Sequence, residues 1–289
     1  MHLGLILPNY GESLDAERLV AAAVAAEEAG FHSGWVTDHI LVPTEHARVY
    51  GTIAEPLVSL AFLAARTTTL ELGVSALVVP QRNPLVALKQ LTTLDFLSGG
   101  RIVTAVAPGW MEGEFATLGA DFANRGRLLG EWLGLAKSVF EQMPGRVQFE
   151  GELFNVDGWL APGLVHPGGP ELWVAGVSRA TLKRAALTGT WHPVALTPDE
   201  LRPMAAELRE QRPDSRVVLR IGVTFLGEPD HGRDERGRHA IAGPPPWIAE
   251  RLAEYVEAGC DGFVLNLEYD RASLEERVSL FADEVVPLL

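Results

Sequence analysis

The chain has 289 residues, 47% hydrophobic and 21% charged, which is typical of a globular protein with one large core. No apolar run is long enough to cross a bilayer, and the single cysteine excludes an internal disulfide framework and agrees with a reducing cytoplasm. The formal net charge of −14, without any run of lysine and arginine, argues against a nucleic-acid or membrane partner and leaves a small molecule as the expected ligand.

In the first half of the chain, a short apolar strand, a polar loop and an amphipathic helix recur as a unit. Strands are predicted at residues 3–7, 34–37, 70–76 and 101–107, and helices at 15–29, 56–66, 84–97 and 125–142. Asn83 and Pro84 are typical of a helix start, and Gly99 and Gly100 of a helix end. This alternation predicts a parallel sheet.

The second half interrupts this pattern and then resumes it. The glycines, prolines and alternating apolar residues of about 147–170 indicate a hairpin-like excursion. Further strands are predicted at 171–175, 191–196, 217–226 and 262–267, and helices at 178–187, 199–211, 246–258 and 273–285, with a polar loop at about 228–244. Eight strands with eight helices predict an α/β fold, a (β/α)8 TIM barrel with insertions, formed as a single domain over residues 1–289.

Several predicted strands stop abruptly in polar or glycine-containing residues. Because parallel strands of a barrel present its active site at their carboxyl ends, the chemistry is expected at Asp38, His39, Ser75 and Gly109. Histidine titrates near neutrality, and a neighbouring carboxylate or burial can tune it to donate or accept a proton. His39 is therefore the leading acid/base candidate, with a histidine that only holds the loop or the barrel rim as the alternative.

Common catalytic and nucleotide-binding motifs are absent from the sequence. It contains no G-x-G-x-x-G after a strand, no P-loop, no H-E-x-x-H and no G-x-S-x-G, which weakens Rossmann, P-loop, zincin and α/β-hydrolase interpretations. His39 and His46 are the only close histidines, and a probable loop separates them. No metal site is therefore predicted.

Several short motifs occur along the chain in a recognisable order. They are Trp35-Val-Thr-Asp-His39, Asn83-Pro84, Leu94-Asp-Phe-Leu-Ser-Gly-Gly-Arg101, Leu172-Trp-Val-Ala-Gly-Val-Ser178 and Gly259-Cys-Asp-Gly-Phe-Val-Leu-Asn266. Each is weak alone, but the ordered set resembles the bacterial luciferase-like superfamily, and most closely its deazaflavin-dependent oxidoreductases. That resemblance implies a TIM barrel whose strand ends bind either FMN or the deazaflavin coenzyme F-420.

The resemblance also implies roles for particular residues. In the deazaflavin group, a histidine at the position of His39 commonly lies beside the reactive carbon, and Asp38 helps to orient the site. Cofactor contacts are expected from the carboxyl ends of the third, fourth and fifth strands, with a non-proline cis peptide in the first of these segments and a phosphate site in the last: Val74, Ser75 and Ala76; Ala107, Pro108, Gly109 and Trp110; Gly176, Val177 and Ser178. A trans strand end at Ser75, a rim-packed Trp110 and a plain helix cap at Ser178 remain open alternatives.

The predicted function is that of an oxidoreductase that moves a hydride between coenzyme F-420 and a small organic substrate, with His39 handling the proton. The alternatives are an FMN-dependent luciferase-like monooxygenase using reduced flavin and oxygen, and a non-catalytic flavin-binding barrel. Asn9 and His192 are predicted to contact substrate, together with the weaker candidates Tyr10, Asn266 and Glu268. Arg82 is expected to be a solvated charge, with contact to the cofactor tail as the alternative, and Glu114 either serves the site or only begins a helix. By resemblance, a cytoplasmic homodimer is expected.

Overall fold

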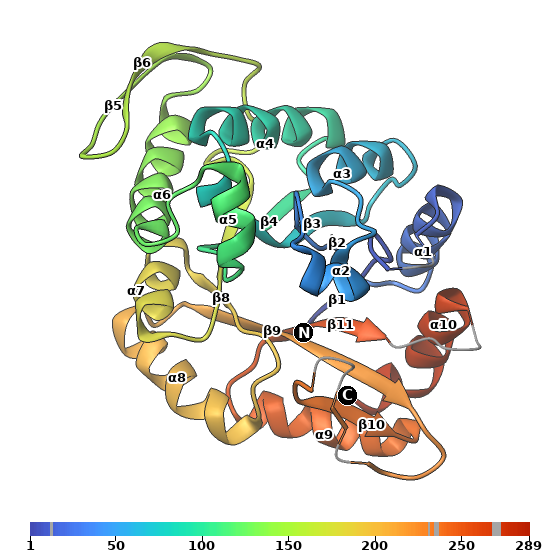
Figure 1. Cartoon of the computed structure of the whole chain (residues 1–289). Helices are drawn as coiled ribbons and strands as arrows, with labels where there is room; N and C mark the ends of the chain where they lie inside the picture. Colours follow the sequence, from blue (N-terminus) through green and yellow to red (C-terminus); the bar gives the residue numbers. More distant parts are fainter. Residues whose placement is uncertain (12–13, 231, 234–236, 268–272) are drawn as a thin grey trace. The chain divides into compact units, whose positions relative to one another are not determined.

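A computed structural model describes all residues except 12–13, 231, 234–236 and 268–272 (Figure 1). The chain divides into two compact units. Unit 1 comprises Met1–Leu7, Ala16–Trp35 and Trp173–Leu289, and unit 2 comprises Pro8–Asp15 and Val36–Leu172. Within the described residues, no helix is both long enough and apolar enough to span a membrane.

Strands and helices alternate along the chain in the order of a (β/α)8 barrel. The barrel strands are β1 (His2–Ile6), β2 (Ser33–Val36), β3 (Glu71–Val78), β4 (Ile102–Ala107), β7 (Glu171–Ala175), β8 (Thr190–His192), β9 (Arg216–Phe225) and β11 (Gly262–Leu267). The main helices are α1 (Ala16–Glu28), α3 (Pro56–Ala64), α4 (Pro84–Ser98), α6 (Arg125–Gln142), α7 (Arg179–Thr188), α8 (Pro198–Gln211), α9 (Pro245–Glu257) and α10 (Leu274–Glu284). Shorter helices include α2 (Ala47–Tyr50) and α5 (Glu112–Leu118).

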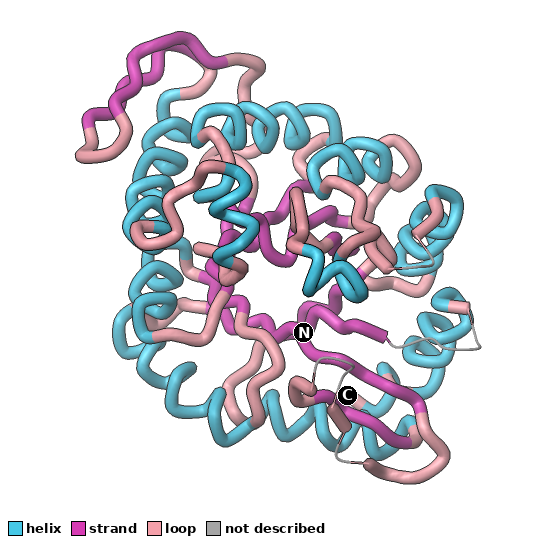
Figure 2. The backbone as a smooth tube through the Cα atoms, in the orientation of Figure 1, coloured by secondary structure: helices cyan, strands magenta, loops and turns pink. Residues whose placement is uncertain are grey.

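Unit 1 is built around parallel pairing of β1, β9 and β11. β11 lies between the other two strands, with Leu3 opposite Phe263 and Phe263 opposite Leu219. These strands are buried almost throughout, as expected for parallel strands covered on both faces. In Figure 2, helices α8, α9 and α10 lie on the outer side of β9 and β11.

A short strand that was not predicted, β10 (Ala240–Gly243), lies in the expected polar loop at 228–244. It pairs in parallel with the end of β9, placing Ala240 opposite Gly222 and Gly243 opposite Phe225. The neighbouring strand β8 is shorter than the predicted 191–196, and its pairing with β9 reaches only Arg216 and Val217 at the start of β9. The last residues of the long β9 are therefore available to pair with β10. This strand is an apolar tetrapeptide that sequence periodicity alone does not identify.

Unit 2 contains the parallel pair β3 and β4 and the antiparallel hairpin of β5 (Gly145–Glu150) and β6 (Asn155–Leu160). The hairpin overlaps the first part of the excursion predicted at 147–170, and Figure 1 shows it beyond the ends of α4 and α6. Helix α4 begins at the predicted cap, because the Asn83 side chain accepts from the backbone N–H groups of Leu85 and Val86. It ends at Gly99, whose φ of 71° is readily adopted only by glycine.

The Leu-Ser-Gly-Gly-Arg motif has a structural explanation at Arg101. Its guanidinium donates to the backbone carbonyls of Ala64, Leu70 and Ser98 and to the hydroxyl of Thr67. These acceptors lie at the end of α3, before β3 and at the end of α4. One side chain thus joins three successive elements through bonds that a planar, multiply donating group is suited to make.

Candidate active site

In unit 2, His39 follows the end of β2 and is held by a carboxylate from a distant part of the chain. Its Nδ1 donates to Oε2 of Glu114 over 2.9 Å, and the two side chains are only 6% and 1% exposed. Glu114 belongs to the short helix α5, which was not predicted. Of the two alternatives that the sequence left open for Glu114, the structure therefore favours a part in the site.

Glu114 also fixes the backbone that follows His39. Its Oε1 accepts from the N–H groups of Ile40 (2.6 Å) and Leu41 (3.2 Å). Burial acts to raise the pKa of Glu114, but hydrogen bonds from His39, Ile40 and Gln81 outweigh it and leave the pKa below its ordinary value. The carboxylate is therefore ionised at neutral pH and accepts from every group around it.

The ionised Glu114 determines which nitrogen of His39 is available for chemistry. Because a carboxylate only accepts, the hydrogen of a neutral His39 imidazole is placed on Nδ1, and Nε2 carries a lone pair. Among the described residues, Nε2 has no hydrogen-bond partner. His39 can therefore accept a proton at Nε2 and return it, while Glu114 stabilises the imidazolium form.

The neighbouring Asp38 is buried and forms a separate network. Arg82 donates from Nη1 to Oδ2 (2.7 Å) and from Nη2 to Oδ1 (2.8 Å), and the N–H of Val78 donates to Oδ2. Arg82 also contacts Glu55 at 3.2 Å. Burial acts to lower the pKa of Arg82, but Asp38 and Glu55 outweigh it and raise the pKa. The expectation of a solvated Arg82 is therefore wrong, because the buried Asp38 requires a cation beside it.

The end of β3 has the backbone feature expected from the resemblance. The peptide bond between Ser75 and Ala76 is cis, within the predicted segment Val74-Ser75-Ala76. The pairing with β4 shifts here, since Ser75 lies opposite Ala105 whereas Leu77 lies opposite Val106. Val74 and Ser75 are buried and Ala76 is half-buried.

The loop after β4 carries the other predicted cofactor contacts of unit 2. Ala107, Pro108 and Gly109 are half-buried. Gly109 has a φ of 86°, and a Cβ there would lie 2.6 Å from Val78 and 2.7 Å from Phe115. Only glycine suits this position, both for its backbone conformation and for the close packing of the loop.

Two aromatic rings lie close to the buried His39. Its ring centroid lies 4.4 Å from that of Tyr50 and 6.2 Å from that of Trp110, which in turn contacts His46 at 5.4 Å. Trp110 is 57% exposed, so it is not simply packed into the core. This aromatic cluster, formed by His39, His46, Tyr50 and Trp110, offers flat apolar surface beside a proton-transfer group.

In unit 1, Gly176, Val177 and Ser178 connect β7 to α7. Gly176 has a φ of 131°, and a Cβ there would lie 2.8 Å from the Thr181 hydroxyl. Ser178 caps α7 by accepting from the N–H of Thr181, so the alternative of an N-cap is confirmed. Val177 and Ser178 are exposed, and so are Arg179 and Ala180 in the first helical turn. The start of the helix is thus both capped and accessible, and these two properties are compatible.

The two residues predicted to contact substrate have structural partners instead. In unit 2, the Asn9 side chain is fully buried, donates to the carbonyls of Thr37 and Ala54 and accepts from the Thr37 N–H. In unit 1, His192 is fully buried, and its Nδ1 donates to the carbonyl of Val218 over 2.7 Å. Neither side chain presents surface to a ligand in this structure, so we do not retain these two assignments.

The pairings of His39 and Asp38 were missed, although Glu114 and Arg82 were themselves considered, because the partners are far apart in sequence. Glu114 lies 75 residues from His39, and Arg82 lies 44 residues from Asp38. Tyr50 was missed because the sequence around it has no regular period. Of the weaker substrate candidates, Tyr10 and Asn266 are half-buried, and Glu268 lies outside the described residues.

Comparison with known proteins agrees with this geometry. Residues 1–231 match the model of the family described as luciferase-like monooxygenase. This chain belongs to that family. Its curated relatives include the alkanal monooxygenase alpha chain of Photorhabdus luminescens, which is 27% identical over 183 residues, covering 63% of this chain and 49% of the relative. The chain thus spans about half the length of that luciferase-like relative.

Solved structures of two further proteins have similar folds. The monooxygenase RslO1 from Streptomyces bottropensis has a TM-score of 0.82 at 16% identity, with 99% of both chains covered. The coenzyme F-420 dependent tetrahydromethanopterin reductase from Methanopyrus kandleri has a TM-score of 0.81 at 16% identity, covering 99% of this chain and 98% of that one. These likenesses confirm the predicted TIM barrel with luciferase-like fold. One of these two proteins is named a monooxygenase and the other a reductase that depends on coenzyme F-420.

Proposed function

We propose that this luciferase-like protein is an oxidoreductase that moves a hydride between coenzyme F-420 and a small organic substrate. The observation that carries the proposal is the buried pair of His39 and Glu114, which leaves Nε2 of His39 without a partner among the described residues. Reduction of a carbonyl, or oxidation of an alcohol, requires a proton to accompany the hydride. A histidine with one nitrogen anchored and the other available is suited to supply or remove it.

Features of each unit, taken separately, support the binding of a flavin-shaped group. In unit 2, Oε1 of Gln81 is buried without a partner among the described residues, so a bound donor would satisfy it. Ser75, Ala76 and Gly109 are small residues at the ends of two strands, which favours close approach of the backbone to a flat ring. In unit 1, the accessible first turn of α7 offers N–H groups and the positive end of the helix dipole to a phosphate.

In this mechanism the cofactor supplies the hydride chemistry, and the protein supplies placement and proton transfer. The Glu114 carboxylate keeps a hydrogen on Nδ1 of His39, so that Nε2 accepts the proton of a substrate hydroxyl or donates one to a substrate oxygen. The ion pair of Asp38 with Arg82 fixes the backbone immediately before His39. Tyr50 and Trp110 shield the imidazole from water and provide apolar contacts to the substrate.

An FMN-dependent monooxygenase is the second candidate, favoured by the likeness to the alkanal monooxygenase alpha chain. The same strand ends and the same helix start would suit FMN, which also carries a phosphate. In that case the His39 pair would serve a reduced flavin and oxygen instead of a hydride acceptor. The two candidates therefore differ in the cofactor bound and in whether oxygen is consumed.

Cofactor titration followed by kinetics of His39→Ala tests the proposal. We expect F-420 to bind more tightly than FMN, and the variant to keep its F-420 affinity while its turnover with alcohols or carbonyl compounds falls by about 100- to 10,000-fold. His46→Ala is the matched control, because His46 belongs to the aromatic cluster but has no carboxylate partner among the described residues. Selective FMN binding with oxygen uptake would establish the monooxygenase instead, and binding without any turnover would favour a carrier protein.

We also propose that two copies of the chain associate through α3 and α4 of unit 2. Both helices are apolar around most of their circumference, yet Val58, Val86, Phe96 and Leu97 are exposed. Between the helices lies a groove of about 280 Å³ with five apolar and three polar lining residues: Leu57, Val58, Ala61, Leu94 and Leu97, and Lys89, Gln90 and Thr93. A helix that is apolar all round is normally covered, and in a twofold dimer the same face of each copy covers the other.

Sedimentation analysis of Leu97→Glu tests the proposed dimer. We expect the wild-type chain to sediment as a dimer and the variant as a monomer, because a charge would be buried at the contact. Leu187→Glu on α7 is the control, since Leu187 is 67% exposed and Leu97 is 63% exposed. A monomeric wild-type chain, or equal effects of the two substitutions, would contradict the proposal.

A further inference from the structure

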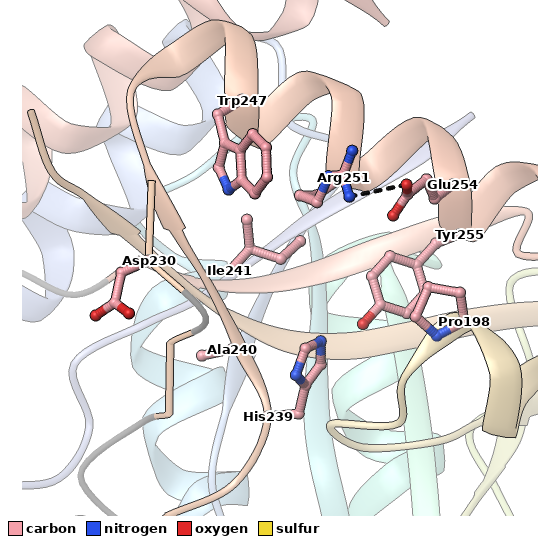
Figure 3. Close-up of a pocket in the computed structure, with 9 residues that line it drawn as sticks. All are labelled: Pro198, Asp230, His239, Ala240, Ile241, Trp247, Arg251, Glu254 and Tyr255. Carbon is pink, nitrogen blue, oxygen red and sulfur yellow. Dashed lines mark ion pairs between the residues drawn. The ribbon is translucent and has the colours of Figure 1, made fainter. Parts of the chain in front are cut away.

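Unit 1 contains a partly open cavity of about 130 Å³ that the proposed function does not use (Figure 3). It lies where the unpredicted strand β10 faces α9 and the start of α8. Apolar and aromatic side chains form most of its wall, with a few charged groups: Pro198, Asp230, His239, Ala240, Ile241, Trp247, Arg251, Glu254 and Tyr255.

The apolar part of the cavity is held by tight packing. Ala240 and Ile241 of β10 are buried, and a Cβ on Gly243 would lie 2.5 Å from the Trp247 ring, so the end of β10 packs directly on the indole. Tyr255 is 1% exposed and donates its hydroxyl hydrogen to the Leu196 carbonyl over 2.8 Å. The aromatic walls are therefore fixed in place before any ligand arrives.

The charged part of the cavity is negative. Arg251 is its only lining lysine or arginine among the described residues, and it is held between Glu254 (2.8 Å) and Glu250 (3.0 Å) while stacking on Trp247 at 4.3 Å. Asp230 adds a further carboxylate at the exposed rim. In Figure 3, Asp230 and Glu254 lie on opposite sides of Ile241. The lining carboxylates therefore outnumber the single lining cation, Arg251, and its positive charge is already neutralised.

From this combination, we propose that the cavity binds a small organic cation with an apolar body, such as a primary ammonium on a hydrocarbon ring or short chain. The ammonium group would be attracted by the excess carboxylate charge, and aromatic faces attract cations as well. The apolar body would contact Ile241, Trp247 and Tyr255. An anion is disfavoured because Nη1 and Nη2 of Arg251 each contact a carboxylate, which leaves only the buried Nε without a partner among the described residues.

The volume limits the ligand to a single small ring. A cavity of about 150 Å³ lined by apolar side chains is known to hold benzene, so 130 Å³ suits a body of that size or slightly smaller. Because the ammonium group can extend towards the rim at Asp230, benzylammonium is a suitable probe. Its neutral and anionic analogues of similar size, benzyl alcohol and benzoate, separate the effect of charge from that of shape.

Isothermal titration calorimetry of the whole chain with these three probes tests the proposal. We expect benzylammonium to bind with a Kd of about 1 mM or tighter, benzyl alcohol several-fold more weakly, and benzoate not measurably. The indole N–H resonance of Trp247, assigned by its loss in Trp247→Phe, is expected to shift when benzylammonium binds. The titration needs neither flavin nor substrate, so its outcome is independent of the proposed activity.

Charge-removing variants locate the binding site. Asp230→Asn and Glu254→Gln are each expected to weaken benzylammonium binding by about threefold to fivefold. Glu257→Gln is the matched control, because Glu257 is also on α9 but does not line the cavity, and its variant should bind as the wild type does. An unchanged unfolding midpoint confirms that each variant is folded.

Three results would overturn the proposal. Benzoate binding as tightly as benzylammonium would show that charge does not select the ligand. Equal weakening in Glu257→Gln and Glu254→Gln would show that only the net charge of the chain matters. Absence of benzylammonium binding to the folded wild-type chain would show that the cavity takes no ligand of this class.

Discussion

His39 in unit 2 and His192 in unit 1 are both buried histidines at the ends of barrel strands, but their surroundings differ in kind. His39 donates to an ionised carboxylate and keeps Nε2 available. His192 donates to the carbonyl of Val218 and stacks on Trp35, with ring centroids 5.6 Å apart and planes 18° apart. Burial lowers the pKa of His192 to about 3, so it remains neutral at physiological pH. A polar residue at a strand end is thus a functional candidate only when its partners leave it an accessible atom.

The largest loss of stability is expected when the ion pair of Asp38 with Arg82, next to His39, is removed. Arg82→Met leaves the Asp38 carboxylate buried without its cation, which is expected to reduce the free energy of unfolding by about 3–5 kcal/mol. Urea unfolding measures this loss. Asp38→Asn combined with Arg82→Met is expected to recover part of it, because no buried charge then remains.

Arg48→Met is the control for Arg82→Met, because Arg48 is exposed. Its effect on the free energy of unfolding is expected to stay below about 0.5 kcal/mol. Similar unfolding midpoints for Arg82→Met and Arg48→Met would show that the buried ion pair does not hold the loop before His39.

The sequence predicts the fold more fully than it predicts these supports. Period-two and helical patterns are local, so the strands, the main helices and the hairpin could be found from neighbouring residues. The partners of Asp38 and His39 could not, because Arg82 and Glu114 become neighbours only when distant loops meet. The residue type alone did not separate His39 from His192 either, since burial of an imidazole depends on side chains from other strands.

A smaller effect is expected when the carboxylate partner of His39 is neutralised. Glu114→Gln weakens charge-assisted hydrogen bonds to His39, Ile40 and Leu41, which is expected to cost about 2 kcal/mol of unfolding free energy at pH 7. Turnover is expected to fall while cofactor affinity is retained, because the imidazolium loses its counter-charge. The pH dependence of turnover should also change, which a purely structural role of Glu114 would not cause.

The stability that Glu114 contributes is expected to depend on pH. Its folded-state pKa lies below the ordinary 4.5, so the ionised carboxylate stabilises the fold above about pH 4.5 and loses this contribution as the pH falls further. Glu114→Gln should therefore lose less stability between pH 5 and pH 3 than the wild type does. Glu112→Gln, an exposed change at the start of the same helix, is the control. Identical acid sensitivity of Glu114→Gln and the wild type would contradict the assigned role.

The smallest effect concerns the enclosed His192. In the unfolded chain its imidazole takes up a proton as the pH falls through about 6.5, whereas in the folded chain it resists protonation until about 3. The unfolded state therefore binds more protons in this interval, and stability falls as the pH decreases below 6.5. Between pH 6.5 and pH 5 this histidine is expected to account for about 1.5 kcal/mol of the loss.

His192→Gln should flatten the pH dependence of the unfolding free energy by that amount, even if altered packing makes the variant less stable at pH 7.5. Replacement of the exposed His166 by Gln is the comparison, and urea unfolding at several pH values measures both variants. An unchanged slope in His192→Gln would mean that this imidazole is protonated as readily in the fold as outside it, which its enclosure by Trp35 and Val218 argues against.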